Sequence, residues 1–104
     1  MIDLLPEQIK IVKRILREYA PDIEVRAFGS RVNGKAEKYS DLDLVLMGKE
    51  KLDWRFIEAL KDAFSESDLP FMVDVVDVRA VSESFCHIIE KNNIVIQKST
   101  GVDN

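Results

Sequence analysis

The spacing of apolar residues changes along the chain between a helical and a strand-like pattern. Three segments place apolar side chains every three or four positions, which predicts helices at residues 6–19, 54–65 and 82–91. Four short runs rich in Val, Ile, Leu and Phe predict strands at residues 23–28, 41–47, 71–77 and 94–97. The alternation of these elements predicts an α/β or α+β domain, with helices packed on a small mixed sheet.

Residues at the ends of the segments support the helix predictions. Pro6 suits the first position of a helix, and Pro21 ends the same helix. Asp53 and Ser82 are typical N-cap residues for the second and third helices. The expected inward-facing residues are Ile9, Val12, Leu16 and Tyr19 in the first helix, Ile57, Leu60 and Phe64 in the second, and Phe85, Ile88 and Ile89 in the third.

Length and charge limit the class of protein. With 104 residues we expect one domain over residues 1–104, with a frayed polar tail at 98–104. A net charge of −4 argues against direct nucleic-acid binding, which needs a basic face. We find no signal peptide and no membrane span, and the single cysteine suits a reducing compartment, so a cytoplasmic location is expected.

Two aspartates spaced i, i+2 open the second predicted strand. Asp41 and Asp43 would point to the same face, with Cα atoms roughly 7 Å apart, whereas Leu42, Leu44 and Leu46 would line the buried face. Two carboxylates at this spacing can bind one metal ion or bridge two. The alternative is an ordinary loop end with a solvated edge aspartate, which a lone Asp-x-Asp pattern cannot exclude.

A third carboxylate favours the metal site. Asp74 falls in the middle of the predicted strand 71–77, where a buried and unpaired carboxylate would be costly. A metal shared with Asp41 and Asp43 would remove that cost. Asp77 would face the other way as a strand-end or cap residue, and it remains a weaker alternative for the third ligand.

A Gly-Ser turn lies ten residues before the acidic pair. Gly29 allows tight backbone geometry, and Ser30 would open a short helical turn through Val32 whose first N–H groups favour anions. Arg31, Lys35 and Lys38 follow, and all three could contact a polyphosphate. A Gly-Ser pair alone is usually an ordinary turn, so the fixed distance to the aspartates carries the prediction.

The single histidine gives no competing site. His87 lies in the last predicted helix beside Cys86, and we interpret it as a surface or helix residue. One His and one Cys cannot form a zinc site, and adjacent residues diverge on a helix.

Together these residues resemble a known family. The pattern is similar to that of nucleotidyltransferases of the DNA polymerase beta superfamily. It consists of a Gly-Ser pair, ten further residues, an Asp-x-Asp pair and an aspartate on a later strand. The form GSRVNG…YSDLDL most resembles the minimal nucleotidyltransferases, antitoxins encoded beside HEPN-domain toxins. The resemblance covers roughly residues 9–97.

The resemblance implies a polymerase beta palm-like fold and a two-metal mechanism. Gly29 and Ser30 would hold the triphosphate of ATP, with Arg31 and Lys35 nearby. Asp41, Asp43 and Asp74 would be the catalytic residues and would hold two Mg²⁺ ions. The implied function is transfer of AMP to a tyrosine hydroxyl of a HEPN ribonuclease toxin, in a hetero-oligomer that neutralises the toxin.

Two other functions stay open from the sequence. The chain could neutralise a HEPN partner by covering it, without catalysis. It could also act on a small molecule, such as an aminoglycoside hydroxyl, although no substrate pocket is evident in the sequence. We therefore expect a protein partner to present the acceptor.

Overall fold

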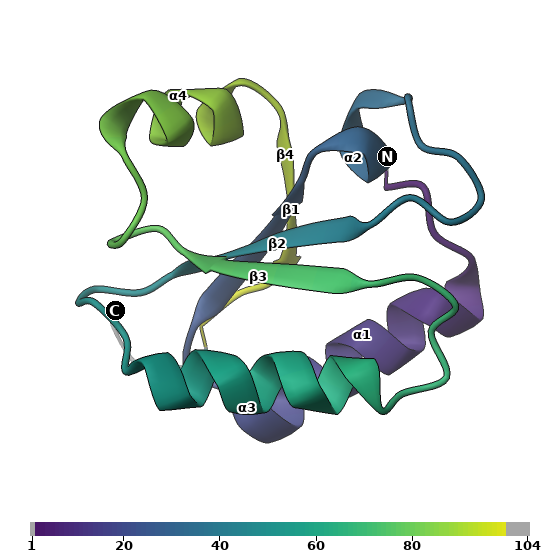
Figure 1. The fold of residues 1–104 in the computed structure, drawn as a ribbon, viewed down its shortest axis with the longest axis horizontal. Helices are drawn as coiled ribbons and strands as arrows, with labels where there is room; N and C mark the ends of the chain where they lie inside the picture. Colours follow the sequence, from purple (N-terminus) through teal and green to yellow (C-terminus); the bar gives the residue numbers. More distant parts are fainter. Residues whose placement is uncertain (1, 100–104) are drawn as a thin grey trace.

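The computed structural model describes residues 2–99, in which helices and strands follow the predicted order (Figure 1). The elements are α1 (Pro6–Tyr19), β1 (Glu24–Phe28), α2 (Ser30–Asn33), β2 (Leu42–Met47), α3 (Trp54–Ser65), β3 (Val73–Asp77), α4 (Glu83–Lys91) and β4 (Asn93–Gln97). Asp53 and Ser82 cap α3 and α4 as predicted, because their side chains accept hydrogen bonds from the first-turn amides of Arg55 and Phe85.

The strands form one mixed sheet in the order β3-β2-β1-β4. β1 is antiparallel to both β2 and β4, whereas β2 and β3 are parallel and are joined through α3. The sequence predicts a small mixed sheet, and this expectation is confirmed. In this order β3 and β4 are the two edge strands.

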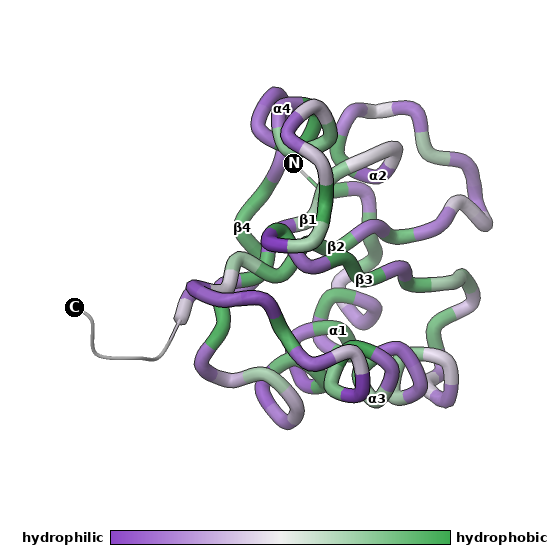
Figure 2. Tube along the Cα trace, turned by 60° about the vertical axis from the view of Figure 1, so that its left-hand side comes forward, coloured by the Kyte–Doolittle hydropathy of each residue, from purple (hydrophilic) through white to green (hydrophobic). Residues whose placement is uncertain are grey.

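The main core lies between the sheet and two helices. α1 and α3 cover one face of the sheet (Figure 1), and the apolar side chains of both helices meet those of the strands. Leu42, Leu44 and Leu46 are fully buried in this core, as the alternation along the strand predicts. In Figure 2, hydrophobic strand segments lie between helices whose outer parts are hydrophilic.

A smaller cluster lies on the opposite face of the sheet. Phe85 and Ile89 of α4 pack against Phe28 and Val45, and the Phe28 and Phe85 rings meet edge to face at 5.7 Å. α4 stands over the part of this face near the C-terminal ends of β2 and β3, while α2 stands at the other end (Figure 1). The N-terminal ends of β2 and β3 therefore lie at the α2 end of the sheet (Figure 1).

Some predicted details are wrong. Ile88 was expected to face inward but is 58% exposed, because the nine-residue α4 contacts the sheet through a narrow stripe that includes Phe85 and Ile89. Tyr19, at the end of the α1 stripe, is also exposed. The frayed tail expected at 98–104 stays a prediction, because residues 100–104 lie outside the described residues; within it, Ser99 donates its hydroxyl to the Asp22 carbonyl.

No helix within residues 2–99 has the length and hydrophobicity that crossing a membrane requires.

Asp77 joins two loops at the C-terminal end of β3. Its buried carboxylate accepts hydrogen bonds from the Leu52 amide at 2.7 Å and the Arg79 amide at 2.9 Å. Asp77 shares a strand face with Val73 and Val75, which pack into the α1–α3 core, so it lies on the opposite face from Asp74. This placement matches the predicted strand-end role.

We expect Asp77→Ala to destabilise the protein by about 2–4 kcal/mol, because two backbone donors lose a charged acceptor in a buried position. Asp77→Asn should cost less, since its carbonyl oxygen can still accept one of the two bonds. Urea denaturation measures both changes. A loss below about 0.5 kcal/mol for Asp77→Ala would show that this carboxylate does not hold the loops together.

Candidate active site

Strand register brings two of the predicted aspartates together. Asp43 of β2 is the direct partner of Asp74 in the parallel β2–β3 ladder, and of Phe28 in the antiparallel β1–β2 ladder. Strands pair about 4.8 Å apart, so the two carboxylates leave neighbouring positions on the same face. Asp41 lies two residues before Asp43 and is exposed at the entrance to β2.

Gly29 places the predicted phosphate turn directly against Asp43. Its φ of 83° and ψ of −156° belong to a region that is essentially restricted to glycine. A Cβ atom built on Gly29 would overlap the Asp43 Oδ2 atom. The Gly-Ser turn and the acidic pair, ten residues apart in the sequence, are therefore in van der Waals contact in the fold.

α2 is a single helical turn that begins at Ser30. The amides of Val32 and Asn33 both donate to the Gly29 carbonyl at 3.0 Å, which leaves the earlier amides of the turn for a ligand. Gly34, with φ 84°, ends the turn in the left-handed conformation. The Lys35 side chain follows immediately and is exposed.

The surroundings of Asp43 disfavour its negative charge. Partial burial raises the pKa of the Asp43 carboxyl above its ordinary value of 3.8, and the charges of Asp74 and Asp41 raise it further. Burial follows from the α4 cluster, since Phe28 and Val45 lie beside Asp43 on the same face of the sheet. Because the pKa of Asp43 is raised by burial and by two nearby carboxylates, a cation at this position would stabilise the site.

Asp74 is not buried, contrary to the sequence-based expectation. β3 is an edge strand, so the Asp74 side chain is 55% exposed, and Asp74 Oδ1 lies 3.7 Å from the Lys61 ammonium of α3. Within residues 2–99 no three acidic, His or Cys side chains are already arranged around a metal position. The three aspartates offer the oxygen donors that Mg²⁺ prefers.

Comparison with known proteins identifies the family. The polymerase beta nucleotidyltransferase family matches residues 10–100, a range that includes all of these aspartates and the Gly-Ser turn. The chain belongs to this family.

A curated relative of this nucleotidyltransferase comes from Haemophilus influenzae and is named "Probable protein adenylyltransferase MntA". The two are 53% identical over 97 residues, which cover 93% of this chain and 85% of the relative.

Two solved structures share the fold of the nucleotidyltransferase. A crystal structure of a toxin–antitoxin with AMP-PNP matches with a TM-score of 0.66 and 23% identity, over 88% of this chain and 74% of the other. A complex of a tri-AMPylated Shewanella oneidensis HEPN toxin with its MNT antitoxin matches with a TM-score of 0.60 and 21% identity, over 89% and 71%. At these identities the matches establish the nucleotidyltransferase fold.

Arg31 has a different environment from the one expected. It is 5% exposed, and its guanidinium donates to the carbonyls of Ser40, Asp3 and Lys38 at 2.9, 2.9 and 3.1 Å. The same group lies 4.1 Å from the centre of the Phe71 ring. Arg31 therefore holds the loop that leads into Asp41, and its guanidinium is committed to backbone carbonyls.

His87 and Cys86 lie on α4. The His87 side chain is 66% exposed and its Nδ1 lies 3.5 Å from Glu90 of the same helix, which confirms the surface interpretation.

Sequence reasoning missed Lys61. In the sequence it looks like one of many solvated lysines, and its separation of 13 residues from Asp74 matches no known motif. Only the packing of α3 beneath β3 brings the two together. No sequence signal would have selected it.

We expect Arg31→Lys to lower the free energy of unfolding by about 1–3 kcal/mol, because an ammonium cannot reach all three carbonyls in the plane of a guanidinium. Amide hydrogen exchange should rise in residues 34–41. Lys35→Ala, a neighbouring exposed cation, should change stability by less than about 0.5 kcal/mol. Equal stability for Arg31→Lys and wild type in urea denaturation would contradict the fastening role.

Asp43→Asn should raise the melting temperature of the protein at pH 7 with a chelator present. The Asp43 pKa is raised in the folded state, so the wild type loses stability as pH rises from 3.8 through the folded pKa, and the loss is complete above it. The gain from Asp43→Asn should therefore shrink as pH falls below 3.8. Thermal unfolding across pH measures this, and a lower melting temperature at pH 7 would contradict it.

Proposed function

We propose that this nucleotidyltransferase transfers AMP from ATP to a tyrosine hydroxyl of a HEPN-domain toxin and so acts as its antitoxin. The observation that carries the proposal is the register that sets Asp43 between the Gly29 backbone and Asp74. The relative named as a protein adenylyltransferase, and the fold shared with antitoxins bound to AMP-PNP or to an AMPylated HEPN toxin, support this acceptor class.

The donor half of the site is the Gly-Ser turn. The first amides of α2 and the Ser30 hydroxyl would bind phosphate oxygens, because the N-terminus of a helical turn attracts anions. Lys35 is exposed at the end of the turn and would neutralise part of the triphosphate charge. Gly29 lets the phosphates approach both the backbone and the Asp43 carboxylate.

Asp41, Asp43 and Asp74 would hold two Mg²⁺ ions. Their carboxylates suit a hard cation, and a cation would offset the burial and the nearby carboxylates that raise the pKa of Asp43. When bound, the ions would neutralise phosphate charge and favour loss of the acceptor proton. Lys61, 3.7 Å from Asp74, supplies one positive charge from the protein itself.

The reaction is a substitution at the α-phosphorus of ATP. A bond forms between the tyrosine oxygen and that phosphorus, and the bond to the bridging oxygen of the β-phosphate breaks. Pyrophosphate leaves with its electron pair, and the phenolic proton passes to solvent. The chain contributes chiefly by holding the triphosphate in place and by excluding water where α4 packs beside Asp43.

We also propose a cytoplasmic location. The ATP donor is abundant there, and the thiol of Cys86 is free in the structure, as a reducing compartment allows.

Incubation with ATP, Mg²⁺ and a purified HEPN protein encoded beside this chain tests the proposal. Intact mass spectrometry should show added adenylyl units on the HEPN protein. Asp41→Asn and Asp43→Asn should each lower the rate by about a hundredfold or more, because they remove charge from the proposed metal site.

Both variants should still bind the partner in size-exclusion chromatography. Asp77→Asn is the matched control, since its carboxylate lies on the other face of the sheet and should not affect transfer. A wild type that neutralises the toxin without modifying it, with both variants equally effective, would show instead that the chain acts by binding alone.

A further inference from the structure

A groove of about 370 Å³ runs along the open edge of β3, beside the acidic site. The groove lies between the second half of α3 and the segment that leads into β3. It shares Asp41 and Asp74 with the acidic site, and its walls also include Lys61, Phe71 and Met72. The groove and the acidic site are therefore continuous, although no part of the groove belongs to the Gly-Ser turn.

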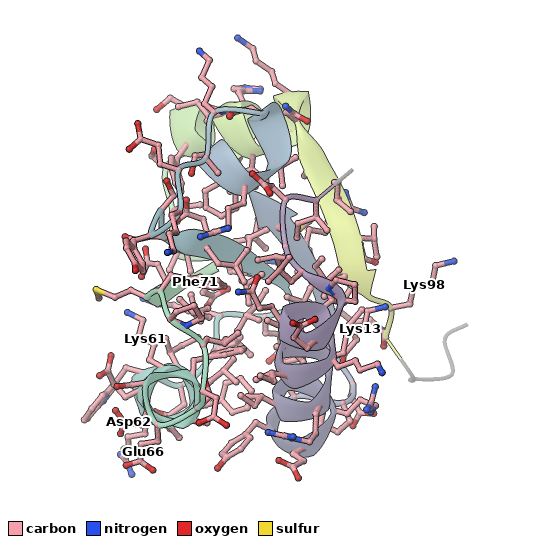
Figure 3. All side chains as sticks on the ribbon, turned by 90° about the vertical axis from the view of Figure 1, so that its right-hand side faces the viewer. Lys13, Lys61, Asp62, Glu66, Phe71 and Lys98 are labelled. Atoms are coloured by element: carbon pink, nitrogen blue, oxygen red, sulfur yellow. The ribbon has the colours of Figure 1, made fainter. Side chains whose placement is uncertain are left out.

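Lys61 supplies the positive charge of the groove. Figure 3 looks along α3 and shows Lys61 extending from the helix toward the level of Phe71, while Glu66 points away. Asp62, the next residue of the helix, also lines the groove. Its ammonium lies 3.7 Å from Asp74 Oδ1 and 3.9 Å from Glu58 of the same helix. Exposed pairs of this kind contribute little to stability, so Lys61 has no strong structural role.

Met72 supplies an apolar surface. Its side chain is 73% exposed, the largest value among the big hydrophobic residues within 2–99. The Met72 carbonyl accepts a hydrogen bond from the Leu42 amide, so the ladder between β2 and β3 extends to it. Met72 therefore stands two positions before Asp74, on the same side of the strand. A flexible thioether at this position is well suited to contact an aromatic ring.

The direction of the reaction points to this groove. In phosphoryl transfer the attacking and leaving oxygens lie roughly in line, on opposite sides of the phosphorus. The proposed triphosphate site follows β1, and across the sheet the next positions are Asp43 on β2, Asp74 on β3 and then Lys61 beyond the edge. An acceptor opposite the departing pyrophosphate therefore enters from the β3 edge.

We propose that this groove is the acceptor site and that it receives a phenol side chain of the partner, which rests on the proposed function above. The ring would pack on Met72, and the phenolic oxygen would lie near the Lys61 ammonium and Asp74. A positive charge here favours the phenolate that forms during attack. The groove thus selects tyrosine over serine or threonine, whose hydroxyls carry no ring and ionise far less readily.

Methyl NMR tests the position of the ring directly. The protein is labelled at the methionine methyl groups and mixed with the HEPN partner and AMP-PNP. The Met72 methyl signal should move upfield with the wild-type partner and with its acceptor Tyr→Phe variant, because both carry a ring. It should not move with the Tyr→Ala variant. Met47, which packs in the α4 cluster, is the internal reference.

Steady-state AMP transfer tests the two residues separately. Lys61→Ala should lower kcat/KM for the partner by about tenfold, with the KM for ATP within about twofold, because Lys61 lies beyond Asp74 from the Gly-Ser turn and faces the groove. Lys61→Arg should restore most of the rate. Met72→Ala should raise the KM for the partner. Lys13→Ala on α1 is the matched control, an exposed lysine that Figure 3 places well away from Lys61.

The outcomes separate the groove from the proposed function. An active wild type with unchanged Lys61→Ala and Met72→Ala would overturn the acceptor site while leaving AMP transfer intact. A complex in which Met72 does not move, or moves equally with the Tyr→Ala partner, would also overturn it. A wild type that modifies no partner would contradict the proposed function, whereas the NMR shift would still report whether a ring enters the groove.

Discussion

The site depends on the crowding of one carboxylate. Asp43 lies on an inner strand, with the Gly29 backbone on one side, Asp74 on the other and the α4 cluster beside it. Burial and the charges of Asp74 and Asp41 raise its pKa, so its negative charge is unfavourable in the folded protein. The fold therefore keeps an unfavourable charge in place, which is the kind of position that a bound cation would stabilise.

Much of this arrangement could be predicted from the sequence, because the informative patterns are local. Strand alternation places Asp41 and Asp43 on one face and the leucines on the other, and caps such as Asp53 fix where helices begin. The spacing between Gly29 and Asp43 predicts their proximity because β1 and β2 are consecutive antiparallel strands. The sequence alone does not reveal that a side chain at position 29 would overlap the Asp43 carboxylate.

The rest depends on packing between distant segments. The strand order makes β3 an edge strand. The exposure of Asp74 and its contact with Lys61 could therefore not be predicted from the sequence around either residue. Arg31 follows the phosphate turn directly, and its charge suggested a ligand contact. Its true partners are backbone carbonyls, including that of Asp3, 28 residues away, and carbonyls have no sequence signature.

The exposed edge of β3 has a consequence for solubility. Edge strands present unpaired backbone groups that can join the sheet of another molecule, and charged side chains on such strands discourage this. Asp74 is such a charge, at the second position of a strand whose other residues are mostly valine. The carboxylate that serves the site therefore also keeps molecules apart, and variants that neutralise it carry a risk of self-association as well as a loss of chemistry.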